Sequence, residues 1–100
     1  MPRYAVVMKW KPERTPEVLK RFGEFVSGKH PKVLEAYKRV NYIVWDFPSA
    51  YGQCVNISVV EGEAADISTI HRFWMDLMKI KVYPSVDLKT ILKFYPDSVI

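Results

Sequence analysis

Two hydrophobic periods alternate along this chain, and their order constrains the fold more than any single motif does. Residues 4–10 are rich in β-branched and aromatic side chains and contain no Gly or Pro, which is typical of a buried strand. Residues 15–26 and 64–78 instead carry apolar side chains at helical spacing. Strand-like runs return at 53–60 and 80–86. With one more strand ahead of the run at 53–60, the order is strand, helix, strand, strand, helix, strand.

This order is the split βαβ pattern of ferredoxin-like domains, βαββαβ. We therefore predict an α+β fold with an antiparallel four-stranded sheet, two helices on one face and a short C-terminal helix capped by Asp87. Pro84 lacks the backbone N–H that a ladder needs, so the last strand should lie at an edge of the sheet. No repeat or linker interrupts the pattern, and residues 1–100 are interpreted as one domain.

Local signals delimit the first helix. Thr15 is placed to cap its N-terminus, and Pro16 suits its first turn. Gly28 is placed to end it. Gly23, in the middle, costs roughly 1 kcal/mol relative to Ala, so we expect it to permit close packing on the sheet.

The segment 33–47 allows two interpretations. Pro31 followed by apolar residues at Val33, Leu34 and Tyr37 is compatible with a short helix, whereas residues 40–45 are plainly strand-like. We favour one long strand over 33–47. The turn residues at 48–52 then join it to the next strand as a hairpin.

Composition limits where the protein works. No run of about 18 or more apolar residues occurs, and residues 1–4 lead into a strand pattern rather than a signal peptide. The lone Cys54 cannot form an internal disulfide, which suits a reducing compartment. We therefore expect a cytoplasmic protein without membrane association. Two Asn and one Gln beside plentiful Lys, Glu, Val and Ile also resemble a thermophile's composition.

The net charge of +4 is unevenly distributed. Residues 1–40 hold ten Lys and Arg against four acids, whereas residues 41–100 hold five against seven. Such asymmetry marks either a surface for nucleic acid or an acidic ligand, or the solvated face of an amphipathic helix and its flanks. We favour the solvated face.

The strand predicted at 53–60 has two different faces. Val55, Ile57 and Val59 alternate with small, mostly polar residues, namely Cys54, Asn56 and Ser58. A central strand with such a polar face is more consistent with a cavity or a wet interface than with a dry core.

Two stretches resemble a known family. Residues 10–17, WKPERTPE, are similar to the signature at the end of that family's first strand, and residues 74–77 and 82–86, WMDL and VYPSV, are similar to its closing signature. The family is domain of unknown function 3303, within the dimeric α/β-barrel superfamily, and the resemblance spans residues 4–86. It implies a ferredoxin-like monomer whose sheet pairs with a second copy, often with a cavity between sheet and helices or within the barrel. It implies no reaction.

Four side chains are our candidates for lining a small-molecule cavity between the sheet and the second helix. They are Trp10, Asn56, His71 and Trp74. Aromatic walls with a few polar groups are typical of such sites. The alternatives stay open, since these tryptophans, like Trp45, could equally be core or dimer contacts, and a lone His on a helix stripe is more often a packing residue.

The sequence leaves open whether the protein is an enzyme. His71 is the only candidate for a proton carrier, because its pKa suits acid–base work. No group of Cys, His and acids has metal-ligand spacing, and no nucleotide-binding motif occurs. We predict no metal site and no cofactor, so any reaction would be cofactor-independent chemistry on a small molecule.

Our favoured function is therefore an uncharacterised homodimer that binds a small molecule. The alternative is a structural or regulatory interaction domain whose sheet face is consumed by dimerisation. Nucleic acid ranks third as a partner. Residues 51–57 only faintly echo the third-strand motif of RNA-recognition domains, and no stacking aromatics follow them.

Overall fold

A computed structural model describes residues 2–50 and 53–86, together with Lys89 and Lys93. Its helices and strands succeed one another as follows: β1 (Arg3–Trp10), the 3₁₀ turn η1 (Pro12–Arg14), α1 (Thr15–Val26), α2 (Pro31–Arg39), β2 (Asn41–Asp46), β3 (Ser49–Ala50), β4 (Gln53–Glu61), α3 (Ala64–Trp74) and β5 (Lys79–Pro84). The helix predicted to follow Asp87 falls largely on residues outside this description.

The strands form one antiparallel sheet in the order β2-β4-β1-β5, with the two-residue β3 paired to the start of β4. β1 lies in the centre, where Val7 is opposite both Ile57 of β4 and Lys81 of β5. This is the strand order of a ferredoxin-like domain, so the predicted α+β fold class is confirmed. The prediction from Pro84 is also confirmed, because β5 is an edge strand.

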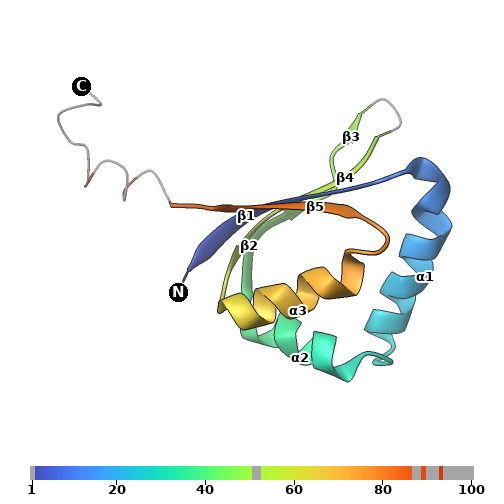
Figure 1. The fold of residues 1–100 in the computed structure, drawn as a ribbon, viewed down its shortest axis with the longest axis horizontal. Helices are drawn as coiled ribbons and strands as arrows, with labels where there is room; N and C mark the ends of the chain where they lie inside the picture. Colours follow the sequence, from blue (N-terminus) through green and yellow to red (C-terminus); the bar gives the residue numbers. More distant parts are fainter. Residues whose placement is uncertain (1, 51–52, 87–88, 90–92, 94–100) are drawn as a thin grey trace.

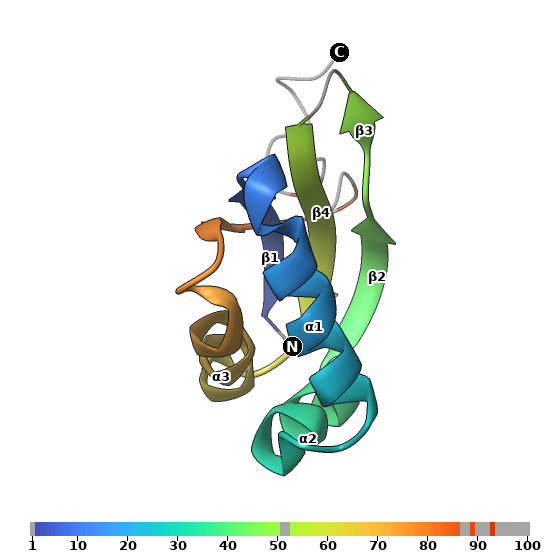
Figure 2. The ribbon, with the colours of Figure 1, turned by 90° about the vertical axis from the view of Figure 1, so that its right-hand side faces the viewer.

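The three helices of the described residues lie on the same side of the sheet, and none of these residues forms a second layer on the other face (Figure 1). α2 and α3 run beside each other beneath the strands, while α1 descends from the end of the sheet (Figures 1 and 2). The core fills the space between sheet and helices. Its buried members are Val6, Met8, Val18, Ala36, Val60, Ile67, Ile70, Trp74 and Leu77.

The strand predicted over 33–47 is wrong in its first half, because residues 31–39 form the helix α2, and right in its second half, where Asn41–Asp46 form β2. Pro31 occupies the first helical turn, where its missing N–H is not needed. Ala36 is fully buried against the core. Lys38 and Arg39 lie in the last turn, where positive charges interact favourably with the negative end of the helix dipole. Tertiary packing of a nine-residue helix therefore overrides the strand propensity at its start.

The ends of α1 agree only in part with the expectations. Gly28 adopts a φ of 84°, the left-handed conformation of a glycine that ends a helix, as predicted. Thr15 is not the N-cap, since that position belongs to Arg14. The expected role of Gly23 is also wrong, because a Cβ built there would meet no atom within 4 Å.

Gly62, unlike Gly23, lies where two segments of the chain come close together. A Cβ on Gly62 would lie 2.6 Å from Cγ1 of Val40, where the chain leaves β4 for α3. The Gly62 N–H also donates a 3.0 Å hydrogen bond to the carbonyl of Pro2. A side chain at this position would collide with Val40, where α2 leads into β2.

Ion pairs join the helices at their outer surfaces. Arg21 of α1 forms a bidentate pair with Asp76, just beyond α3, and donates a 2.8 Å hydrogen bond to the carbonyl of Phe73. Arg39 of α2 lies 2.9 Å from Asp66 of α3. The guanidinium of Arg21 holds the pKa of the Asp76 carboxyl below its usual range.

Within the described part of the chain, no helix has both the length and the apolar character needed to cross a membrane.

Candidate functional site

The alternating pattern of β4 determines what each side of the sheet offers. Asn56 and Ser58 are 3% and 1% exposed and lie on the helix side, opposite Met8 and Val6 of β1. Ile57, on the other side, is 42% exposed. The small polar face is therefore turned into the protein, and the aliphatic face is turned outward.

A cavity of about 250 Å³ opens between the sheet and the helices at the end of β4 where Asn56 lies. We call it the aromatic cavity, and its lining residues are Met8, Trp10, Val18, Leu19, Phe22, Tyr37, Tyr42, Trp45, Phe47, Asn56, Trp74 and Met78. Asn56 and Trp74 are among its buried members, whereas Leu19 and Phe47 are 65% and 59% exposed. The cavity therefore has a floor of buried residues and an apolar opening between Leu19 of α1 and Phe47, which follows β2.

Three rings form a stacked wall of the aromatic cavity. Tyr42 and Trp45 lie 4.9 Å apart between ring centroids, and Tyr37 lies 5.8 Å from Tyr42 and 5.9 Å from Trp45, all within about 23° of parallel. A β-bulge between Tyr42 and Val44 makes this possible. In a regular strand, residues three apart point to opposite faces, but the bulge brings Tyr42 and Trp45 to the same face.

The hydroxyl of Tyr37 lies inside this wall. It accepts a 3.0 Å hydrogen bond from Nε1 of Trp74, which links α2 to α3 across the cavity. Burial raises the pKa of Tyr37, and it raises that of Tyr42 further, with the neighbouring Tyr37 adding to the effect. Both phenols therefore stay protonated at neutral pH and act as neutral hydrogen-bonding groups.

Asn56 is the polar group at the floor. Its Nδ2 donates a 3.0 Å hydrogen bond to the backbone carbonyl of Asp46, and because a carbonyl only accepts, this contact fixes the orientation of the amide. Among the described residues, nothing donates to Oδ1 of Asn56. Because Asn56 lines the cavity, this oxygen is the hydrogen-bond acceptor that the residue offers to a ligand.

Trp10 forms the end wall, and its position is fixed by a short polar chain. Its Nε1 donates a 3.1 Å hydrogen bond to Oγ1 of Thr15, which in turn lies 3.7 Å from Sγ of Cys54. The hydroxyl that was expected to cap α1 thus holds the indole ring instead.

The structure brings three of the four predicted site residues together on one cavity, namely Trp10, Asn56 and Trp74. His71 is not among them. It lines a different, open groove between α3 and the edge strand β5, beside Tyr4 and Ile80. Burial lowers the pKa of His71, which makes the neutral imidazole the prevailing form at neutral pH.

Several lining residues were not predicted from the sequence. Tyr37 was assigned to a strand, and Tyr42 was not considered as a site residue. Leu19 and Phe22 looked like core positions of an amphipathic helix, but they are exposed at the mouth. Trp45 was weighed with the other two tryptophans as a pocket wall but was not among the four predicted site residues, and all three tryptophans line this cavity.

No family model and no curated protein matches the chain. Among solved structures, it is similar to the de novo designed protein Foldit4, with a TM-score of 0.51 at 12% identity over 86% of this chain and 97% of that one. The de novo designed protein Ferredog-Diesel follows at 0.49, with 15% identity over 81% and 83% of the two chains. MupZ from Pseudomonas fluorescens follows at 0.41, with 12% identity over 95% and 82%. The likeness to Foldit4 establishes the fold alone.

Proposed function

We propose that this protein binds a small, neutral, largely aromatic molecule in the aromatic cavity. The observation that carries the proposal is the buried Asn56 on the cavity floor, whose amide nitrogen is engaged while no described residue donates to its oxygen. A buried polar atom without a partner is unfavourable unless something bonds to it. The ligand is therefore expected to carry an O–H or N–H donor beside its ring.

The lining indicates the charge of this ligand. Among the described residues, the walls are aromatic and aliphatic and include no Lys, Arg, Asp or Glu. A charged ligand would lose its hydration in such a site without gaining an opposite charge. A neutral molecule avoids this penalty and stacks on the wall of Tyr37, Tyr42 and Trp45.

The volume limits the ligand to one substituted ring or two fused rings. An apolar cavity of roughly 150 Å³ is enough for benzene. The 250 Å³ measured for the aromatic cavity leaves room for a few more heavy atoms. Exposed Leu19 and Phe47 at the mouth would cover the part of the ligand that extends outward.

We propose binding without a catalytic step. Tyr37 and Tyr42 have raised pKa values and cannot serve as bases near neutral pH. His71, the only proton carrier that the sequence suggested, lies in another groove.

We further propose that two copies pair through the open face of the sheet, in the manner implied by the resemblance to domain of unknown function 3303. Val44, Ile57 and Tyr83 on that face are all more than a third exposed. An aliphatic sheet face of this kind is normally covered by a second layer. Native mass spectrometry of Ile57→Glu against the unmodified protein tests the pairing. A dimer that the substitution leaves intact would contradict it.

Ligand binding is tested by titrating the intrinsic fluorescence with p-cresol and with p-xylene, which has the same shape but no hydroxyl. All three tryptophans line the cavity, so occupancy changes the emission. We expect a dissociation constant on the order of 0.1–1 mM for p-cresol and about fivefold weaker binding of p-xylene, as one hydrogen bond would give.

The variant Asn56→Leu should abolish the preference for p-cresol while p-xylene still binds. Ser58→Ala is the matched control, because Ser58 is equally buried on the same face of β4 but does not line the cavity. Equal affinity for the two probes in the unmodified protein, or an unchanged preference in Asn56→Leu, would reject the assignment of Asn56.

A further inference from the structure

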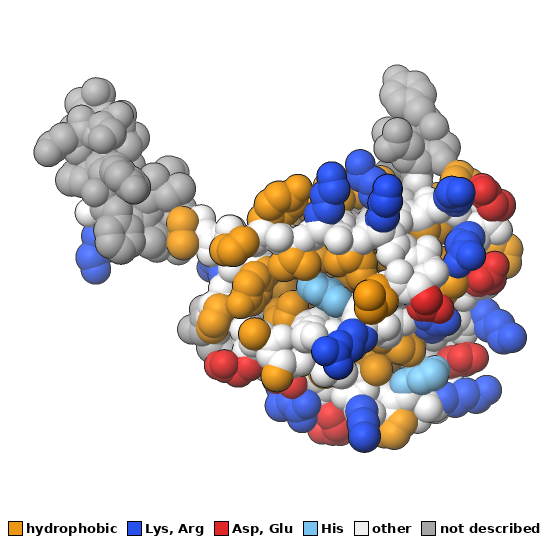
Figure 3. Space-filling view, in the orientation of Figure 1, with side chains coloured by type: hydrophobic (Ala, Val, Ile, Leu, Met, Phe, Trp, Pro, Cys, Tyr) orange, Lys and Arg blue, Asp and Glu red, His pale blue; other side chains and the backbone are white. Residues whose placement is uncertain are grey.

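A second, basic groove lies beyond Trp10, where β1 ends and η1 begins. It has a volume of about 650 Å³ and is open to solvent. Four cationic side chains line it: Lys9, Lys11, Arg14 and Lys79. Figure 3 shows blue Lys and Arg side chains gathered above the sheet, over β1 and β5.

The register of the sheet forces two of these lysines together. Lys9 of β1 is directly opposite Lys79 of β5 in the antiparallel ladder. Lys81 follows two residues later on the same face of β5. Like charges directly opposite each other destabilise a sheet. Within the described residues, none of these three lysines has a carboxylate within 4 Å to offset the repulsion.

One carboxylate lines the groove, but it is already engaged. Asp76 forms the bidentate pair with Arg21, and its backbone carbonyl accepts a 3.1 Å hydrogen bond from Nη1 of Arg14. The positive charge of Lys9, Lys11 and Lys79 is therefore not balanced from within the groove. A concave surface lined by one sign of charge concentrates the opposite charge.

We infer that this basic groove binds a compact polyanion, such as a phosphate ester or a polycarboxylate. Lysine acts as a flexible point charge rather than as a planar fork, so the groove recognises charge density more than geometry. The anion would also relieve the repulsion between Lys9 and Lys79, so its binding should raise the thermal stability of the protein.

This site goes beyond the proposed small-molecule site and does not depend on it. Lys9 and Lys79 lie on the open face of the sheet, through which we propose that two copies pair, so anion binding is measured at protein concentrations where the chain is monomeric. The aromatic cavity and the basic groove share Trp10 and Met78, but the lysines and Asn56 belong to different sites. A neutral probe such as p-cresol reports on the aromatic cavity alone, and a small anion reports on the basic groove.

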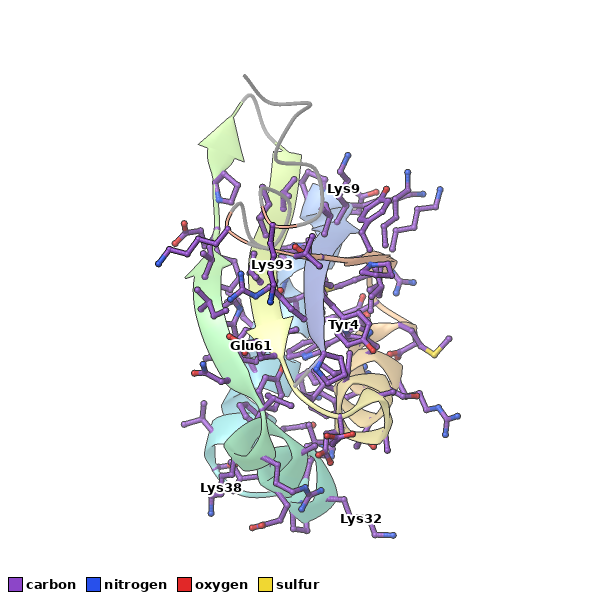
Figure 4. All side chains as sticks on the ribbon, turned by 90° about the vertical axis from the view of Figure 1, so that its left-hand side faces the viewer. Tyr4, Lys9, Lys32, Lys38, Glu61 and Lys93 are labelled. Atoms are coloured by element: carbon purple, nitrogen blue, oxygen red, sulfur yellow. The ribbon has the colours of Figure 1, made fainter. Side chains whose placement is uncertain are left out.

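The test is isothermal titration at low salt with inorganic pyrophosphate and, in a separate arm, with citrate. Lys79→Gln removes one cation of the opposed pair, and Lys32→Gln is the matched control with the same change of net charge. Lys32 lies on α2 at the far end of the molecule from Lys9 (Figure 4). We expect Lys79→Gln to weaken pyrophosphate binding about tenfold, and Lys32→Gln to change it less than about twofold.

A second readout separates binding from folding. Lys79→Gln should raise the midpoint of thermal unfolding at low salt when no anion is present, by a few degrees at most, because the like-charge pair is gone. Pyrophosphate should then stabilise the unmodified protein more than the variant. Binding of pyrophosphate but not citrate would assign the site to phosphate esters, whereas binding of both would assign it to polyanions in general.

Three results would overturn the inference. The first is no binding of either anion by the unmodified protein at low salt. The second is an equal loss of affinity in Lys79→Gln and Lys32→Gln, which would reduce the effect to net charge. The third is tighter binding of a short single-stranded RNA that depends on Lys79, which would reassign the groove to a nucleic acid.

Discussion

On the helix side of the sheet, Asn56 and Ser58 are almost completely enclosed, while on the opposite side the aliphatic Ile57, their neighbour in sequence, is 42% exposed. At residues 56–58 the strand thus buries two polar residues and exposes the apolar residue between them. Small polar side chains inside leave space that aromatic rings from α2, β2 and α3 surround. Apolar side chains outside leave a surface that no second layer from residues 2–50 and 53–86 covers (Figure 1). The two faces therefore point to two kinds of partner, a small molecule inside and a protein surface outside.

The largest expected difference between the two faces is in how much a substitution lowers the free energy of unfolding. Val60→Ala, at a fully buried position on the helix side, should lower the free energy of unfolding by about 2 kcal/mol, because it leaves a cavity in the core. Ile57→Ala, on the open side, should cost under about 1 kcal/mol at protein concentrations where the chain is monomeric.

Chemical denaturation at two protein concentrations checks both values. If a second copy covers the open face, the cost of Ile57→Ala should grow with protein concentration, since the dimer stabilises the folded state by mass action. Equal and concentration-independent losses for the two variants would contradict the contrast between the faces.

The next effect concerns the buried amide. Asn56→Ala removes the donor to the carbonyl of Asp46 and leaves that carbonyl without its bond. We expect a loss of about 1–1.5 kcal/mol in denaturant unfolding. Ser58→Ala should change stability less, because no hydrogen bond of its side chain joins it to another described residue. A larger loss of stability in Ser58→Ala than in Asn56→Ala would mean that Ser58, and not Asn56, contributes more to stability on the polar face of β4.

Sequence patterns predicted what depends on neighbours along the chain. The order of strands and helices, the edge position signalled by Pro84 and the helix end at Gly28 are all such local features. The alternation in β4 also indicated a polar face next to a cavity, and three candidate residues lie on one cavity. Local patterns were sufficient here because each feature depends on residues close together in sequence: on their hydrophobic spacing, on the missing N–H of a proline or on the conformation of a glycine.

The stacked wall could not be predicted in the same way. It needs α2 to turn Tyr37 back toward β2, and residues 31–39 fit a helix or a strand by their local pattern alone. It also needs the bulge that brings Tyr42 and Trp45 to one face, against strict alternation. Both are decided by packing between segments, as is the use of Thr15 to hold Trp10 rather than to cap a helix.

A smaller effect on stability is expected at the ion pair between Arg21 of α1 and Asp76, just beyond α3. Arg21→Ala should lower stability by about 1 kcal/mol or less near neutral pH, since Asp76 is largely exposed and such pairs are weak. The pKa of Asp76 is lowered in the folded state, so this contribution is present above its unfolded value and is lost as the pH falls through the folded one.

Denaturation of Arg21→Ala and the unmodified protein between about pH 7 and pH 2 measures this dependence. The difference in stability should shrink toward the acid end, to the part that the contacts with Phe73 supply. A difference that is constant over the whole range would show that Arg21 acts through Phe73 and not through its ion pair with Asp76.

The smallest effect belongs to His71. Burial lowers its pKa in the folded state, so the neutral ring contributes stability that is present above the unfolded value of about 6.5 and is lost as the pH falls below it. His71→Gln should flatten the loss of stability on acidification below that value. It should also leave the affinity for p-cresol unchanged, because His71 lines a separate groove. If His71→Gln lost p-cresol binding, His71 would have to be counted among the residues of the ligand site.

The most direct test of the central claim is a filtered nuclear Overhauser experiment on the protein with p-cresol bound. The ring protons of the probe should show contacts to the Met8 methyl group and to the indole of Trp74, both of which line the aromatic cavity on the helix side. Contacts confined to Ile57 and Tyr83 on the open face would contradict the account, because they would make the outer surface, and not the cavity floored by Asn56, the place where small aromatic molecules bind.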